Sequence, residues 1–123
     1  MAFEALVSWN RFTLIASSDF SASQYYAGII DTNGQCALAG AGVNADGIMQ
    51  DKPVIGRSGA LVSGGYSKAV AGAAVTAGSP VMTDATGRFV PATAGNFIIG
   101  KAATAASGVG IVFTVLLRPG GKA

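Results

Sequence analysis

Residues 31–47 read DTNGQCALAGAGVNADG, and 53 positions later residues 84–100 read DATGRFVPATAGNFIIG. Six of the seventeen aligned positions are identical, so the chain contains a weak internal repeat. In each copy an aspartate, Asp31 or Asp84, can start a turn by accepting hydrogen bonds from backbone N–H groups. Three residues later Gly34 or Gly87 can supply the positive φ that closes a hairpin with a G1 bulge. The repeat therefore predicts two equivalent β-hairpins.

Short runs of β-branched and aromatic residues flank these turns and recur along the chain, separated by glycine and proline. This pattern is typical of many short strands. We expect strands at 12–16, 26–30, 35–39, 60–63, 68–70, 81–83, 88–91, 97–103 and 111–117. Residues 21–24 can form one helical turn, capped by Asp19 or Ser21. The predicted fold class is all-β, a small barrel or sandwich of short antiparallel strands with at most that helical turn.

The chain divides into residues 1–18, which precede the repeat, and residues 19–123, which we expect to form a single β-domain. The first segment has no glycine or proline, and its large apolar side chains include Phe3, Leu6, Trp9 and Phe12. We expect it to extend from the body as an arm, with these side chains as anchors on a neighbouring subunit or other partner. The alternative is an extra strand that completes the core of its own domain.

Composition limits the classes of function. Only 11% of the 123 residues are charged, whereas soluble domains usually carry about a quarter. Either much of the surface is buried against other subunits, or serine, threonine, asparagine and glycine cover it. The net charge is +2 and the basic residues are scattered singly, so we expect no nucleic-acid partner.

Targeting signals are also missing from the sequence. Residues 1–16 lack the features of a signal peptide. The longest strongly apolar run near the end, residues 111–117, is too short to span a membrane as a helix. We therefore expect no membrane partner. The single Cys36 cannot form an internal disulfide.

The closest approach to an enzymatic motif lies inside the second repeat. Residues 95–101 resemble a phosphate-binding P-loop, but Ala102 stands where a Mg²⁺-binding hydroxyl is needed. The residues between Gly95 and Gly100 are aromatic and β-branched, which favours a strand. A nucleotide site is therefore not expected.

No other pattern supports chemistry. The chain has no histidine, which removes the usual general base and the commonest metal ligand. Ser58 lacks the second glycine of a nucleophile elbow, and residues 40–45 match a dinucleotide motif only loosely. Asp46 and Asp51 lack the third ligand of a calcium loop, and Cys36 fits a small core residue. We expect no catalytic residue, no cofactor and no metal, and hence no enzyme.

An ordered set of short motifs resembles the capsid decoration, or cement, proteins of tailed bacteriophages over about residues 15–118. The motifs are DFSASQY at 19–25, GYSKAVAG at 65–72, AGSPV at 77–81, DATGR at 84–88, PA at 91–92, IG at 99–100 and VLL at 115–117. The resemblance implies a β-tulip fold and a non-enzymatic virion protein on the outer surface of the expanded head. It also implies symmetric oligomers, commonly homotrimers, that clamp neighbouring major capsid protein subunits after synthesis in the host cytoplasm.

Two other functions stay open at this point. One is a different virion component, such as a tail-tube or minor head protein, which would share the composition. The other is a surface glycan-binding β-module, with Trp9, Tyr25 and Tyr26 as stacking candidates.

Overall fold

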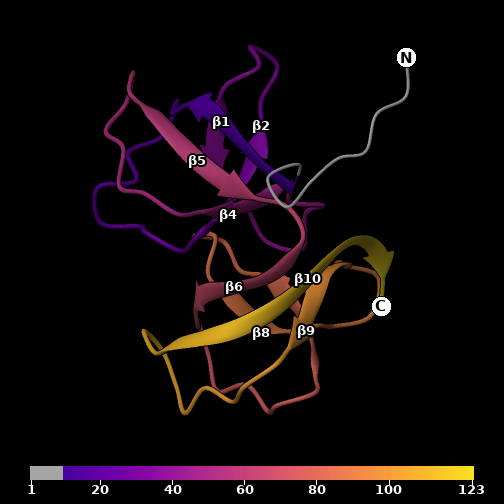
Figure 1. Ribbon diagram of the computed structural model, residues 1–123. Coiled ribbons are helices and arrows are strands. Elements are labelled where there is room, and N and C mark those ends of the chain that lie inside the picture. The colour runs from indigo at the N-terminus through magenta and orange to yellow at the C-terminus, as the bar shows by residue number, and fades with distance from the viewer. Residues whose placement is uncertain (1–9) are drawn as a thin grey trace.

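The computed structural model describes residues 10–123, apart from the side chains at positions 119 and 120, and shows ten strands (Figure 1). They are β1 (Arg11–Ile15), β2 (Ala27–Ile30), β3 (Cys36–Leu38), β4 (Gly47–Met49), β5 (Ser58–Val62), β6 (Gly65–Val70), β7 (Pro80–Thr83), β8 (Phe89–Pro91), β9 (Phe97–Ala102) and β10 (Val112–Lys122). The predicted all-β class is confirmed. All nine expected strands are present, and β4 is an addition to them.

The helical turn considered for residues 21–24 does not form; the segment consists of turns. Asp19 nevertheless caps it, because its Oδ1 atom accepts a hydrogen bond of 2.9 Å from the backbone N–H of Ser21.

The strands form two five-stranded antiparallel sheets with the same connectivity. The first sheet has the order β1-β5-β4-β2-β3 and the second has the order β6-β10-β9-β7-β8. A parallel bridge joins Ala16 to Cys36 in the first half, and the equivalent bridge joins Ala71 to Phe89 in the second. Each bridge connects the first strand of its half to the third, so each sheet curls back on itself. The whole described body is thus a tandem duplication, and the repeat seen in the sequence is part of it.

For part of residues 1–18 the structure shows the extra strand that was the alternative to an arm. β1 pairs with β5 along its whole length, from Arg11 opposite Val62 to Ile15 opposite Ser58. It is the counterpart of β6, which pairs with β10 in the second half. Phe12 is half-buried against the smaller hydrophobic core. Residues 11–15 are therefore a strand of the body, because β5 needs a hydrogen-bonding neighbour on that edge.

The other three proposed anchors, Phe3, Leu6 and Trp9, lie outside the described residues.

The two hairpin turns have the same geometry. In each, Oδ1 of Asp31 or Asp84 accepts hydrogen bonds of 2.9 Å from the backbone N–H groups two and four positions later. The glycine N–H donates to the aspartate carbonyl oxygen, at 3.0 Å for Gly34 and 3.2 Å for Gly87. Both glycines have positive φ, 73° and 88° respectively, as a G1 bulge requires.

Two hydrophobic clusters stabilise the body. The smaller lies within the first half and contains Ala16, Phe20, Cys36, Met49 and Leu61. The larger joins the halves, because Ala27, Ile48 and Val62 of the first sheet share it with residues such as Phe89 and Val115 of the second. Backbone hydrogen bonds cross the same junction, including one of 2.8 Å from the N–H of Ala27 to the carbonyl of Gly87.

Candidate docking surface on the second sheet

The duplication gives each surface of one half a counterpart on the other. In the first sheet a cross-strand row runs from Val62 on β5 through Ile48 on β4 to Ala27 on β2. In the second sheet the matching row runs from Leu116 on β10 through Lys101 on β9 to Pro80 on β7. The two rows occupy the same register positions of the same topology.

These matching rows differ in their burial. Ala27 and Ile48 are fully buried and Val62 is 9% exposed, because this face of the first half packs against the second half. Lys101 and Pro80 are exposed. The second half therefore presents, uncovered, the face with which the first half makes a protein contact.

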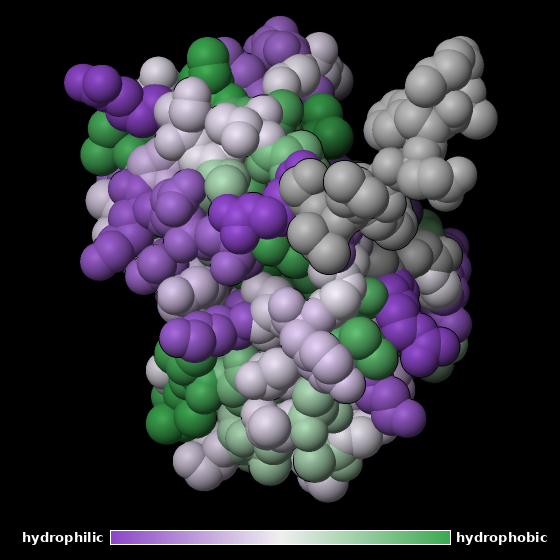
Figure 2. Space-filling model, in the orientation of Figure 1, coloured by the Kyte–Doolittle hydropathy of each residue, from purple (hydrophilic) through white to green (hydrophobic). Residues whose placement is uncertain are grey.

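The uncovered face, which we call the β9–β10 face, is apolar and basic. It comprises Tyr66 and Lys68 of β6, Leu116 and Arg118 of β10, Lys101 of β9 and Pro80 of β7. Tyr66 is 70% exposed, an unusual value for a large aromatic side chain. Hydrophobic surface also gathers at the left edge of the lower half in Figure 2. Ile111 and Val112, at the start of β10, are exposed.

Charge is distributed unequally between the halves. Residues 10–62 carry three basic and four acidic residues, a net charge of −1, whereas residues 63–123 carry five basic and one acidic, a net charge of +4. The basic residues look scattered in the sequence, but Lys68, Lys101 and Arg118 share one face in space. None of the residues that make up the β9–β10 face is an aspartate.

The carboxylates of the described aspartates bind backbone amides. All five described aspartates accept at least one hydrogen bond from a main-chain N–H; they are Asp19, Asp31, Asp46, Asp51 and Asp84. Among the described residues the one ion pair joins Arg88 Nε to Asp84 Oδ2 at 3.2 Å. Most of the basic side chains therefore have no acidic partner within residues 10–123.

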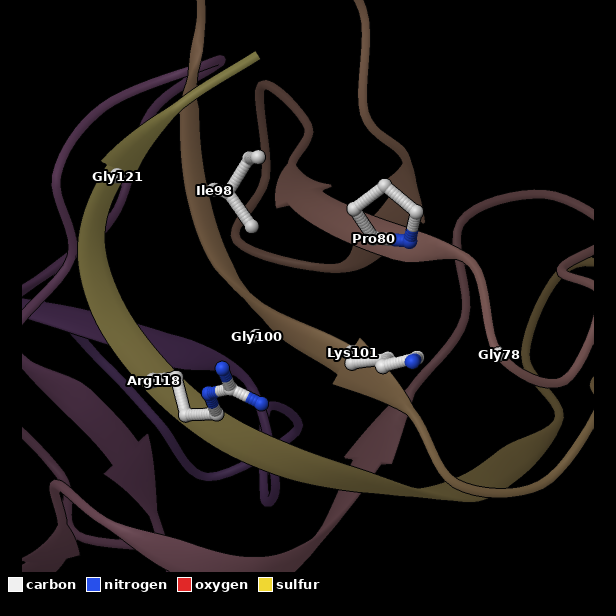
Figure 3. A pocket seen from close by; sticks show the side chains of 7 residues that line it. All are labelled: Gly78, Pro80, Ile98, Gly100, Lys101, Arg118 and Gly121. Atoms are coloured by element: carbon white, nitrogen blue, oxygen red, sulfur yellow. The ribbon is translucent and has the colours of Figure 1, made fainter.

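A pocket of about 360 Å³ opens at one end of the β9–β10 face. Figure 3 shows Lys101 and Arg118 on neighbouring strands, with Pro80 and Ile98 beside them. Glycines 78, 100 and 121 complete the lining. The pocket exists because the pairing of β10 with β9 shifts between Leu117 and Gly121, so Arg118 leaves the regular ladder.

The stretch that resembles a P-loop forms a strand in the structure, as its residues predicted. Residues 97–102 form the regular strand β9 instead of a phosphate-binding loop. Lys101 lies on its exposed face, opposite Leu116.

Cys36 is fully buried, and burial, followed by the charges of Asp31 and Asp46, raises the pKa of its thiol to about 11. Such a thiol stays protonated and is a poor nucleophile.

Two kinds of feature are absent from residues 10–123. No cluster of three or more metal-ligating side chains is found in this part of the chain. Nor does it contain a helix long and apolar enough to cross a membrane.

The tyrosines proposed to stack on sugars are half-buried. Tyr25 packs against the larger core, has a positive φ of 68° and lies beneath the ammonium of Lys68, 5.7 Å from the ring centre. Tyr25 and Tyr26 line a second, shallower groove with Ser21, Gln24 and Lys52. Trp9 lies outside the described residues.

Comparison with known proteins finds the same fold in a solved structure. The crystal structure of the head fibre gp8.5 N base of bacteriophage phi29 superimposes with a TM-score of 0.70. The similarity covers 88% of this chain and 92% of that one at 19% sequence identity, and so shows a shared fold. No curated protein matches in sequence.

The sequence profile of the phage cement protein family matches residues 21–118. The chain therefore belongs to the phage cement protein family. It is a structural protein of the phage head, located with the capsid of the virion.

Proposed function

We propose that the chain binds the outer surface of the expanded phage head and stabilises contacts between major capsid protein subunits. The observation that carries this proposal is the family match over residues 21–118, nearly the whole described body. The low content of charged residues supports it, because a neutral surface loses little hydration energy on docking.

The proposed active form is a symmetric homotrimer. A capsid presents the same surface many times, so a trimer can use three weak contacts where a monomer uses one. Avidity of this kind resists outward pressure on the shell without requiring a strong single site. Neither a nucleic acid nor a membrane is needed for this function.

Co-sedimentation tests head binding directly. Purified chain should pellet with expanded, DNA-free heads and saturate at a fixed number of copies per head. An unrelated small β-protein of similar mass should stay in the supernatant. Decorated heads should also release their subunits at a higher temperature than bare heads. Absence of saturable binding would refute the proposal, and tubes or rings formed by the chain alone would favour a tail component.

Light scattering on the isolated chain tests the trimer. A mass three times that of the 12.2 kDa chain is expected at micromolar concentration. A monomer both in solution and in cross-linked decorated heads would contradict trimer formation.

A further inference from the structure

We infer that the pocket between Lys101 and Arg118 is the site at which this protein captures an acidic loop of its protein partner on the head. The inference rests on the proposed function, since it names the contact through which the chain would bind. The ligand group is a carboxylate of a glutamate or aspartate side chain.

The first step of the inference is that the first half already uses the matching face to hold a tight turn of the second half. It is the β7–β8 turn, which begins at Asp84 and ends at Gly87. Its Gly87 carbonyl accepts a hydrogen bond of 2.8 Å from the N–H of Ala27. The backbone of this face is therefore suited to receiving a tight turn from another element.

The second step is the set of substitutions that distinguish the two faces. Pro80 replaces Ala27, so the backbone N–H that holds the internal turn is missing from the second half. Lys101 replaces Ile48, so a buried apolar side chain becomes an exposed cation. The second face has lost the means of binding this chain's own turn in the same way, and it has gained a charge that selects an anionic ligand.

The third step concerns the partners of the basic side chains in the second half, and in particular of Lys101 and Arg118. Lys68 and Lys122 lie over aromatic rings, at 5.7 Å from the centre of Tyr25 and 4.7 Å from that of Phe97. The charged groups of Lys101 and Arg118 have no hydrogen bond, ion pair or ring partner among the described residues. Both side chains line the same pocket, so the charge of each would attract an anion that enters it. An arginine beside a lysine also supplies the fork of donors that a carboxylate accepts.

The walls of the pocket favour a side chain over a free ion. Pro80 and Ile98 are apolar and can contact the methylene groups of a glutamate, and the three glycines let a loop approach closely. Exposed Tyr66 and half-buried Leu116 continue the apolar surface beyond the pocket. A polypeptide with a carboxylate at its tip matches this combination, and an isolated inorganic anion would use only part of it.

Nuclear magnetic resonance of the full-length chain tests the site without any capsid. The probe is a capped peptide of four glutamates, compared with a capped peptide of four glutamines and with inorganic phosphate. Only the glutamate peptide should give saturable shifts centred on the amides of Gly78, Ile98 and Gly100. The double variant Lys101→Gln/Arg118→Gln should weaken this binding at least tenfold.

The matched control is Lys52→Gln/Arg57→Gln, which removes one lysine and one arginine from the exposed surface of the first half. It should bind the peptide within twofold of the unaltered chain. Neither double variant should lower the melting temperature, because all four side chains are exposed. Equal loss in both variants would show non-specific attraction and overturn the site. Saturable binding of phosphate without the glutamate peptide would assign the pocket to a phosphate group and overturn the stated ligand.

Head binding separates this inference from the proposed function. If the pocket variant binds expanded heads at least tenfold more weakly than the Lys52→Gln/Arg57→Gln control, the inference is supported. Undiminished binding by the pocket variant refutes the site and leaves the proposed function intact, whereas no binding by the unaltered chain refutes the function. If the pocket variant instead fails to self-associate and binds heads normally, its ligand is a second copy, and the assignment to the capsid is wrong.

Discussion

Replacing Gly87 with alanine should destabilise the protein much more than the same replacement at Gly34, although the two residues close equivalent turns. Both have positive φ, and the left-handed conformation costs alanine roughly 1–2 kcal/mol. At Gly34 a new Cβ would meet nothing within 4 Å, so this strain is the whole effect.

At Gly87 the new Cβ would also lie 3.1 Å from the carbonyl oxygen of Ala27 and 3.5 Å from that of Ala39. Both residues are fully buried at the junction of the halves, and Ala27 is held there by its hydrogen bond to Gly87. Overpacking of this kind adds about 1–3 kcal/mol. The expected cost is therefore about 2–5 kcal/mol for Gly87→Ala and about 1–2 kcal/mol for Gly34→Ala.

Urea unfolding followed by circular dichroism, at one fixed protein concentration, measures both values. Asparagine tolerates positive φ better than alanine, so Gly34→Asn should recover part of the loss at position 34. Gly87→Asn should recover little, because the clash comes from the Cβ atom itself. Equal destabilisation by the two alanine variants would show that the β7–β8 turn does not insert between the halves as the structure has it.

Three further predictions concern acid stability, the thiol and the N-terminus. The hydroxyl of Ser17 and then the N–H of Gln35 hold the pKa of Asp31 below its usual value, so the stability from this carboxylate should be present above about pH 4 and decline as the pH falls through the lowered pKa. Ser17→Ala should reduce that decline in urea titrations between pH 6 and 3, and an unchanged pH profile would contradict the assignment. Cys36 should react with a thiol reagent at pH 8 only as fast as the chain unfolds; rapid labelling of the folded protein would show that the smaller core opens. Deleting residues 1–9, which precede β1, should leave the melting temperature nearly unchanged but weaken head binding or self-association, whereas a large drop in melting temperature of the dilute monomer would place Phe3, Leu6 and Trp9 in the core.

The hairpins were predictable because their determinants are local. Four consecutive residues carry both the aspartate that bonds the backbone and the glycine that takes positive φ, so Asp31 to Gly34 and Asp84 to Gly87 specify their turns without help from the rest of the chain. The flanking strands follow from β-branched and aromatic runs for the same reason.

The full duplication could not be found by sliding the sequence at one spacing. The turns stand 53 positions apart, but the parallel bridges relate Ala16 to Ala71, which is 55 positions. The counterpart of β1 is thus out of step with the repeat, so the strand at 12–16 could be predicted but its place in the duplicated body could not. β4 was missed because three residues, Gly47–Met49, carry no periodic pattern and gain their strand character from pairing with β2 and β5.

The pocket could not be predicted from the sequence, for a different reason. Lys101 and Arg118 are 17 positions apart, and they share a cavity only because the β9–β10 pairing shifts beyond Leu117. Register shifts of this kind depend on the twist and closure of a whole sheet, which local propensity does not encode. In the sequence, Lys101 belongs to a stretch that only resembles a P-loop. In the structure, it lines the pocket on the β9–β10 face.

A body built from two stacked copies must end in a face that does not recruit a third. Repeat proteins meet this need with polar residues on the outer face of the terminal repeat. Pro80 and Lys101 meet it here, since one removes a backbone donor and the other places a charge where the first half has Ile48. The same two changes leave the strands of a docking face in place and alter which ligand the face binds. Ending the stack and binding an acidic partner thus require the same residues. The double change Pro80→Ala with Lys101→Ile should therefore weaken binding of the acidic partner and allow a further copy of the chain to pack on this face.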